Sequence, residues 1–175
     1  MNVDLKQYIR DVPDFPKKGI IFKDITTLLK NPVSLKLTLD ILYEKVKDMK
    51  IDKVVGIEAR GFIFGALLAE KLNAGFIPAR KPGKLPAPVF NQTYELEYGT
   101  DTIEIHKDAI SKGDRILLHD DLLATGGTAK AACDLIEKIG GTIVETLFII
   151  ELGFLKGRDQ LKNYKVDSLI NYSAE

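Results

Sequence analysis

A run of small residues between an apolar segment and an amphipathic one constrains this chain more than any other feature. Residues 116–118 are large and aliphatic with no turn former among them, which is typical of a strand buried on both faces of a parallel sheet. Asp120 and Asp121 follow at the expected carboxyl end of that strand. Residues 124–128 then carry little side-chain bulk over their backbone N–H groups. The pattern predicts a strand, an anion-binding loop and a helix that begins at the loop.

The helix expected after this loop has a clear buried face and a clear end. Its apolar residues recur at helical spacing from Thr128 and stop at two glycines: Ala129, Ala132, Leu135, Ile136 and Ile139, then Gly140 and Gly141. A helix start offers free N–H groups and a partial positive charge, which favours a phosphate. The two acids only accept hydrogen bonds, so they suit sugar hydroxyls or a hard divalent cation. The whole string predicts a ribose 5-phosphate site, although any single Gly-Gly or Asp-Asp pair is explained equally well as a solvated loop.

Length and composition limit the classes of protein to which this chain can belong. The 175 residues, 45% of them hydrophobic, suffice for one well-buried α/β domain and are too few for two of ordinary size. The 25 basic and 25 acidic side chains balance, which argues against a nucleic-acid surface. No apolar run approaches a membrane span or signal peptide, and the one cysteine, Cys133, has no disulfide partner in the chain. We expect a single cytoplasmic domain over residues 1–175, with no nucleic-acid or membrane partner and with Cys133 in the core.

Strand and helix patterns alternate along the chain, which predicts an α/β fold whose parallel sheet is flanked by helices on both faces. The expected strands cover residues 53–57, 74–79, 116–118, 142–150 and 166–170, the last at an edge. The expected helices cover residues 2–11, 62–71, 128–139 and 156–163, and another starts at Pro32 and buries Leu35, Leu39, Leu42, Val46 and Met49.

Residues 14–29 combine aromatic and aliphatic side chains with a proline and a glycine, which predicts an ordered loop and a short strand rather than a helix. A planar base needs an apolar face to lie on, and backbone groups can read its edge. Phe22, with the backbone of Ile21 and Lys23, is therefore a candidate for base binding. The simpler alternative, that this arm only packs onto the domain, is equally consistent with the composition.

Two charged loops are further candidates. Arg60 and the N–H groups around Gly61 follow the expected strand 53–57, and ligands of open α/β sheets bind at such strand ends. The alternative is a Glu58–Arg60 pair that caps a helix. Residues 80–88 hold three prolines, a glycine and the cations Arg80, Lys81 and Lys84, which predicts either a basic flap over pyrophosphate or a solvated loop.

Alternating polar and apolar residues at 94–98 and 102–106 predict a hairpin. Glu97 and Tyr98 lie near its expected tip. An acid there is either ordinary surface or, beside a mobile flap, a group that closes onto the substrate.

The order of strand, acid pair, small-residue loop and helix resembles the motif with which type I phosphoribosyltransferases bind phosphoribosyl pyrophosphate (PRPP). It is not a Walker loop, because the string Gly-x-x-x-x-Gly-Lys-Ser/Thr is absent. Four separated strings extend the resemblance to the adenine phosphoribosyltransferases over almost the whole chain: residues 15–26, 58–62, 80–86 with 94–99, and 120–128. The resemblance implies a type I phosphoribosyltransferase-like fold, with an N-terminal hood over about residues 1–33 and a flexible hairpin flap over about 80–105.

The resemblance also implies a reaction and its parts. Adenine and PRPP would give AMP and pyrophosphate, with Mg²⁺ carried by PRPP and no certain protein ligand, in a homodimer. The implied phosphate-binding residues are Ala124, Thr125, Gly126, Gly127 and Thr128, and the implied ribose-binding residues are Asp120 and Asp121. Arg60, Arg80, Lys81 and Lys84 would bind pyrophosphate, and Ile21, Phe22, Lys23 and Leu122 would frame adenine. Glu97 would handle the proton of the base, with Tyr98 beside it and Arg60 as a third catalytic residue.

Three residues depart from the pattern of that family. His119 replaces an aliphatic residue, Thr27 a common proline, and Ala87 a frequent glycine. None removes a group that the reaction needs, and we expect His119 to be packed and hydrogen-bonded rather than catalytic. Two alternatives stay open from the sequence: a phosphoribosyltransferase for another purine base, or a non-catalytic sensor of PRPP or a nucleotide.

Overall fold

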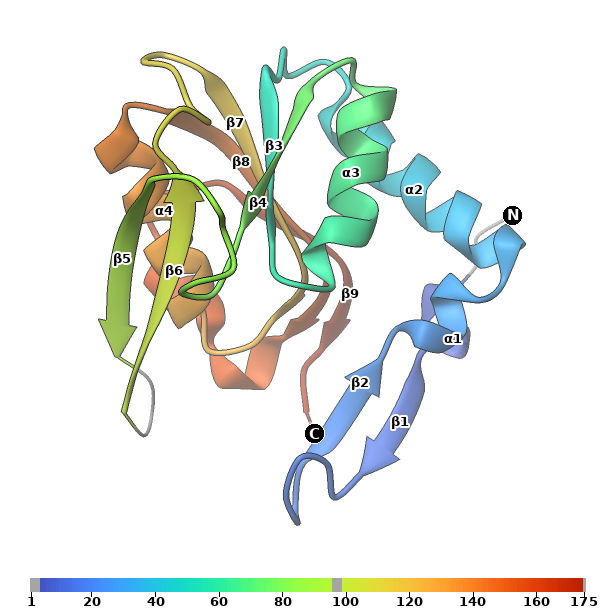
Figure 1. Ribbon diagram of the computed structural model, residues 1–175. Coiled ribbons are helices and arrows are strands. Elements are labelled where there is room, and N and C mark those ends of the chain that lie inside the picture. Colours follow the sequence, from blue (N-terminus) through green and yellow to red (C-terminus); the bar gives the residue numbers. More distant parts are fainter. Residues whose placement is uncertain (1–3, 96–98, 175) are drawn as a thin grey trace.

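A five-stranded parallel sheet forms the centre of the computed structural model, which describes residues 4–95 and 99–174 (Figure 1). The strand order is β4-β3-β7-β8-β9, so β9 is an edge strand as predicted. Glu97 and Tyr98 lie outside the described residues. The strands are β3 (Lys53–Ile57), β4 (Gly75–Ala79), β7 (Arg115–Leu123), β8 (Thr142–Leu152) and β9 (Val166–Tyr172).

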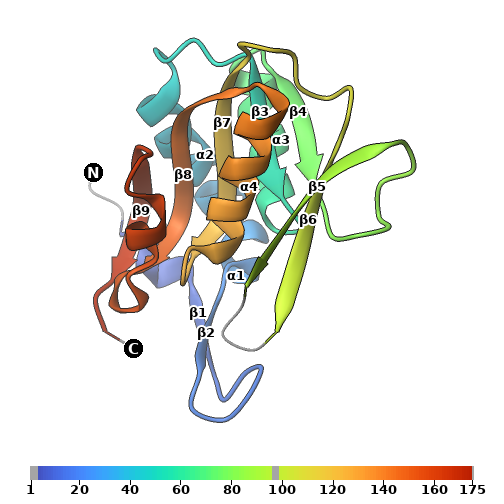
Figure 2. The ribbon, with the colours of Figure 1, turned by 90° about the vertical axis from the view of Figure 1, so that its left-hand side faces the viewer.

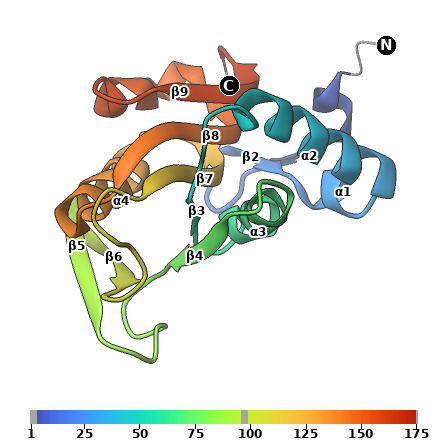
Figure 3. The same cartoon turned by 90° about the horizontal axis from the view of Figure 1, so that it is seen from above.

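Helices cover both faces of the sheet (Figure 3). The helices α2 (Pro32–Val46) and α3 (Gly61–Lys71) pack on one face, and α4 (Gly127–Ile139) packs on the other. Successive strand residues therefore join different cores: Val54 packs with α2 and α3, whereas Val55 packs with α4. Burial on both sides explains why the strands are almost continuously apolar, and it confirms the predicted α/β architecture.

Two antiparallel hairpins flank the carboxyl end of the sheet. The first pairs β1 (Arg10–Pro13) with β2 (Ile21–Asp24), and the second pairs β5 (Val89–Glu95) with β6 (Thr100–His106). Figures 1 and 2 show both hairpins extending past the ends of β3 and β7 from which α3 and α4 begin. The site predicted at those strand ends thus has a hairpin on either side.

Several predicted boundaries were wrong. The predicted helix 2–11 is a 3-10 helix, η1 (Leu5–Tyr8), followed by β1, because pairing with β2 satisfies the backbone there. A short helix, α1 (Thr26–Leu29), follows β2 where no helix was expected. The predicted helix 156–163 is replaced by two 3-10 turns, η2 (Gly153–Leu155) and η3 (Gly157–Leu161). In addition, β7 continues through the acid pair to Leu123 instead of ending before it.

The second predicted helix is present, and its predicted buried face is confirmed in part. Asn31 caps α2 by accepting hydrogen bonds from the N–H groups of Val33 and Ser34. Leu42 and Val46 are buried as predicted, whereas Leu35, Leu39 and Met49 are only half-buried. In the first two turns the buried residues are Ser34 and Thr38, one position before the predicted leucines. Because the helix is apolar on several sides, periodicity alone did not identify the buried side there.

Two predictions about single side chains are confirmed. Cys133 is fully buried, and burial raises the pKa of its thiol to about 12, which leaves it a small core residue. His119 is also fully buried; its Nδ1 lies 2.9 Å from the carbonyl oxygen of Leu147. Burial lowers the pKa of His119 to about 4, so the ring is neutral and its Nδ1–H donates to that carbonyl.

Within residues 4–95 and 99–174, no helix is both long enough and apolar enough to span a membrane.

Glu145 generates a prediction about stability and pH. This β8 residue is 6% exposed, its Oε1 accepts a hydrogen bond from the N–H of Thr146 at 3.2 Å, and burial raises its pKa. The ionised carboxylate therefore costs stability at neutral pH, and the cost is relieved as pH falls through the raised folded-state pKa. We expect Glu145→Gln to stabilise the protein by about 1 kcal/mol at pH 7.5, with a gain that shrinks toward pH 4.5.

Urea denaturation at several pH values measures this effect, with Glu70→Gln at an exposed position of α3 as the control. A gain that is independent of pH, or equal in the two variants, would contradict the assignment.

Candidate active site

The loop between β7 and α4 leaves its backbone open to a ligand. Gly126 is in the left-handed region at φ +86°, and a Cβ atom there would also meet the carbonyl oxygen of Gly157. The loop and the first turn of α4 surround a cavity of about 90 Å³, which is lined by Asp120 and residues 122–129. The predicted residues 124–128 are thus brought together at the start of a 13-residue helix.

A second cavity adjoins the first. It has a volume of about 140 Å³, and its lining includes Glu58, Arg80 and Lys81. Asp120 and Thr128 line both cavities. An elongated ligand can therefore extend from the loop to the basic segment across Asp120.

The two neighbouring acids differ in environment. Asp121 is 2% exposed, and its Oδ2 accepts a hydrogen bond from the Nε of Arg60. Asp120 lines the cavities, and its pKa is raised well above the usual value by burial and by the adjacent charge of Asp121. Asp121 thus serves as the counter-charge of Arg60, while Asp120 is available to a ligand.

The start of α3 packs directly on β7 beside these acids. A Cβ atom on Gly61 would come within 2.9 Å of Asp120 Oδ1 and of the carbonyl oxygen of His119, so only glycine fits there. Arg60, immediately before Gly61, also lies over the ring of Phe22, 5.3 Å from its centroid. Arg60 therefore joins the acid pair to the β1–β2 hairpin, and the predicted alternative of a Glu58–Arg60 pair does not occur.

Two of the three predicted cations of the basic loop, Arg80 and Lys81, already have carboxylate partners. The Nη2 of Arg80 donates to Glu58 Oε1 at 3.0 Å, and the N–H of Lys81 donates to Glu58 Oε2 at 2.8 Å. The hydrogen bond from Arg80 lowers the pKa of Glu58. The ammonium of Lys81 forms an ion pair with Asp101, whereas Lys84 is exposed. These pairs hold the segment against the second cavity.

The β5–β6 hairpin contacts Thr128, which lines the first cavity, through a residue that the sequence did not identify as part of the site. The hydroxyl of Tyr94 lies 3.0 Å from Thr128 Oγ1, and it donates to Asp101 Oδ2 at 3.3 Å. Both Tyr94 and Asp101 come from a stretch that alternates like any surface hairpin. Nothing in that pattern signalled a contact with α4, because the approach depends on the tertiary fold.

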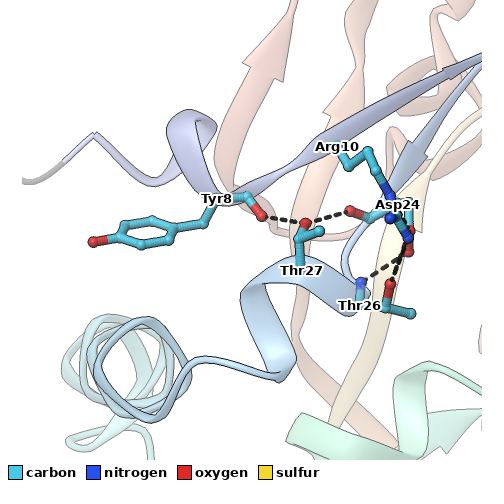
Figure 4. A network of polar contacts seen from close by, with 5 residues as sticks. All are labelled: Tyr8, Arg10, Asp24, Thr26 and Thr27. Carbon is cyan, nitrogen blue, oxygen red and sulfur yellow. Dashed lines mark hydrogen bonds and ion pairs between the residues drawn. The ribbon is translucent and has the colours of Figure 1, made fainter.

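A polar network anchors the β1–β2 hairpin, as Figure 4 shows. The Nε of Arg10 donates to Asp24 Oδ2 at 3.0 Å, and the N–H of Thr26 donates to Asp24 Oδ1 at 2.8 Å. Thr27 Oγ1 donates to the carbonyl oxygen of Tyr8 at 2.6 Å. A proline at position 27 would lack this hydroxyl. The threonine found there therefore adds a hydrogen bond between α1, directly after the hairpin, and η1 at the N-terminus.

The candidates for base binding are only partly brought together. Phe22 packs edge-to-face against Phe15, with ring centroids 5.2 Å apart, beside a cavity of about 260 Å³ that both residues line. Ile21 is half-buried, and Leu122 lines the loop cavity. The side chain of Lys23 points elsewhere: it is 5% exposed and its Nζ lies 2.9 Å from Asp11 Oδ1. Lys23 therefore has only its backbone to offer a base.

Within the part of the chain that the structure describes, no group of three or more His, Cys, Asp or Glu residues is arranged to hold a metal ion.

The sequence matches a known family. The family model of the phosphoribosyl transferase domain covers residues 24–174. The adenine phosphoribosyltransferase of Christiangramia forsetii is 60% identical over 171 residues, which are 98% of this chain and 100% of that protein.

Solved structures agree with this match. The adenine phosphoribosyltransferase of Thermoanaerobacter pseudethanolicus has a TM-score of 0.94 at 50% identity, over 96% of this chain and 98% of that chain. The enzyme of Saccharomyces cerevisiae, solved with adenine and an imino-altritol bisphosphate, has a TM-score of 0.89 at 44% identity, over 94% and 96% of the two chains.

The Arg60–Asp121 pair generates a prediction about stability. Arg60→Met leaves a buried carboxylate without its counter-charge, and we expect a loss of about 2 kcal/mol, less than for a fully buried pair because the Arg60 side chain is 46% exposed. Adding Asp121→Asn should recover part of that loss. Urea denaturation of both single variants and the double variant gives the coupling.

The exposed pair of Lys47 and Glu44 provides the matched control, for which we expect a much smaller coupling because solvent screens both charges. Additive effects at Arg60 and Asp121 would show that the pair does not stabilise the site.

Proposed function

The chain belongs to the phosphoribosyl transferase family, among the adenine phosphoribosyltransferases, and from that membership we propose a role for each part of its site. The chain is a transferase of purine salvage: it moves the 5-phosphoribosyl group of PRPP to adenine, giving AMP and pyrophosphate. The observation that carries this conclusion is the match to adenine phosphoribosyltransferases along 98% of the chain.

We propose that residues 124–128 bind the 5-phosphate of PRPP. The cavity of about 90 Å³ that they line lies at the start of α4, where free N–H groups and the helix dipole favour an anion. The hydroxyls of Thr125 and Thr128 add donors. A ribose attached to this phosphate then lies beside Asp120 and Asp121, and its hydroxyls donate to their carboxylates. Asp120 is the better placed of the two, because it lines both cavities.

The second cavity suits the pyrophosphate. Arg80 and Lys81 line it, and we place Arg60 and Lys84 around the same ligand. The glycosyl bond breaks as positive charge develops on the ribose and negative charge on the leaving pyrophosphate, so cations there stabilise the transition state. The hairpin flanking this cavity is suited to exclude water from the ribose cation.

Charge balance supports the proposed use of Mg²⁺. Arg60, Arg80 and Lys81 each face a carboxylate, so they bring little uncompensated positive charge to a polyanion. Mg²⁺ prefers phosphate oxygens, waters and one or two carboxylates, and Asp120 offers a carboxylate beside both cavities. We propose that PRPP carries the ion into the site. When bound, it neutralises charge on the pyrophosphate.

Adenine is assigned to the space between the β1–β2 hairpin and the loop. The ring of Phe22 provides a flat apolar face, and the backbone of Ile21 and Lys23 offers hydrogen-bonding groups to the edge of the base. Leu122, which lines the loop cavity, is proposed to close the other side. Arg60 lies over Phe22 from the ribose side, so the base face and the ribose acids meet at this guanidinium.

Glu97 is proposed to handle the proton of adenine, with Tyr98 beside it and Arg60 as the third catalytic residue. The support comes from the described residues on either side of Glu97 in the sequence. Glu95 at the end of β5 pairs with Thr100 at the start of β6, and Tyr94 contacts Thr128. A proton acceptor close to the substrate suits chemistry at the base.

The remaining assignments concern the whole chain. We propose a single phosphoribosyltransferase domain over residues 1–175, with a hood over about 1–33 and a flap over about 80–105, that works in the cytoplasm without nucleic acid or membrane. A homodimer is also proposed. Its support is the outer face of α3, where Ile63 is 39% and Leu67 36% exposed, since a second copy would cover these side chains.

Turnover tests the function directly. Purified protein with PRPP, Mg²⁺ and adenine should release pyrophosphate and form AMP, measured by a coupled pyrophosphate assay and by chromatography. Hypoxanthine, guanine and xanthine should give at most about 1% of the adenine rate, because a site built to accept from the amino group of adenine leaves its groups unpaired with an oxo group. Faster turnover of an oxopurine would reassign the base, and no turnover with any base would favour a PRPP-sensing protein.

Glu97 has its own test. Glu97→Ala should lower kcat by roughly 100-fold while KM for PRPP and for adenine changes little, because a proton-transfer group acts mainly in the transition state. Glu95→Ala, two residues earlier at an exposed position, is the matched control and should keep wild-type rates. An unchanged kcat in Glu97→Ala would remove Glu97 from the mechanism.

A further inference from the structure

The phosphate loop rests on a chain segment that has no assigned role. This segment, residues 153–161, connects β8 to β9 as η2 and η3 and lies beside α4 (Figure 1). A Cβ atom on Gly126 would meet the carbonyl oxygen of Gly157, and a Cβ atom on Gly157 would meet that of Ala124 and come within 3.1 Å of the backbone nitrogen of Gly126. The two backbones therefore touch with no side chain between them.

Arg158, next to Gly157, ties this segment to the sheet. Its Nε and Nη2 donate to the two carboxylate oxygens of Glu151 at 2.6 and 2.7 Å, and its Nη1 donates to the carbonyl oxygen of Val166 at 2.7 Å. The Oγ of Ser168 donates to Glu151 as well, at 2.8 Å. One guanidinium thus bonds to both β8 and β9, a fork geometry that lysine does not reproduce.

Glu151 is a firm attachment point. It is 3% exposed, and its register partner on β7 is Leu123, the residue immediately before the phosphate loop. Although burial by itself raises the pKa of Glu151, hydrogen bonds from Arg158 and Ser168 bring it below its usual value, so the carboxylate stays charged. At the other end of the segment, Leu161 is buried in the core under α4. The segment that contains Gly157 is therefore fixed by the Arg158–Glu151 ion pair and by the burial of Leu161.

We propose that Arg158 and Glu151 are positioning residues of the phosphate site, which hold Gly157 as a rigid backing for residues 124–126. The proposal rests on the assignment of this loop to the 5-phosphate. A loop of small residues has few side chains to fix its own shape, so ordering it on ligand binding would cost affinity. If Gly157 holds the loop in its binding conformation before a ligand arrives, this entropy is not lost on binding. The resulting gain in affinity applies to ligands that carry the phosphate.

Two variants disturb the backing in different ways. Arg158→Lys keeps the charge but loses the fork, and Gly157→Ala leaves the ion pair intact but pushes a Cβ atom against Ala124. We expect both to weaken ribose 5-phosphate binding, measured by calorimetry, and to raise KM for PRPP by about tenfold, with KM for adenine and kcat changed less than about threefold.

Matched controls come from this segment and from the residue directly after it. Lys162→Gln removes an exposed cation that lies 4.0 Å from Asp159, and Gly153→Ala places its Cβ atom against the exposed side chain of Asn171 rather than the loop. Both should bind ribose 5-phosphate as the wild type does. Thermal denaturation of every variant, with and without ribose 5-phosphate, reports whether a loss of binding accompanies a general loss of structure.

Wild-type binding of ribose 5-phosphate by both Arg158→Lys and Gly157→Ala would overturn the proposal. So would an equal rise in KM for PRPP and adenine, which a purely structural role predicts. If the wild type itself fails to bind ribose 5-phosphate, the phosphate assignment of the loop fails instead, so the two failures are distinguishable.

Discussion

Backbone segments pack closely against the carboxyl end of β7 and the loop that follows it, and three glycines allow this close packing. Gly61 lets the start of α3 lie against Asp120, while Gly126 and Gly157 let the loop before α4 lie against η3. A side chain at any of these positions would separate elements whose approach creates the two small cavities. The shape of the site thus depends first on positions that have no Cβ atom, and polar side chains line the cavities that form there.

Electrostatics adds a second constraint on the same space. Each of the three cations nearest the acid pair and the second cavity faces a carboxylate of the chain: Arg60 with Asp121, Arg80 with Glu58, and Lys81 with Asp101. Such pairing holds long side chains in place before a ligand arrives, which reduces the entropy that binding must overcome. It also leaves the local charge nearly balanced, which limits the net attraction that these three side chains offer to a polyanion.

The sequence predicted the parts that depend on local pattern. The buried strands, the loop at residues 124–128, the helix that ends at Gly140 and the packed His119 follow from periodicity, small residues and burial, and these predictions are confirmed. It could not predict contacts that tertiary packing creates between distant segments. Tyr94 reaches Thr128, Arg158 reaches Glu151, and the side chain of Lys23 turns toward Asp11, and no spacing within one element encodes such pairings. The short helix α1 was missed for a related reason, since four residues carry too little periodicity to detect.

The segments proposed to bind the two substrates have different supports. The loop proposed for the 5-phosphate is backed by residues 153–161 and by the β8–β9 pair. The face proposed for adenine belongs to a hairpin held by Asp24, by Thr27 and by Lys23, whose Nζ lies 4.3 Å from the centroid of the Tyr172 ring. Within the described residues, Arg60 touches both systems, through Asp121 and through Phe22. Disturbing either support should therefore affect one substrate, while disturbing Arg60 should affect both. Arg60 is accordingly the residue through which the position of the hairpin and the arrangement of the acid pair influence each other.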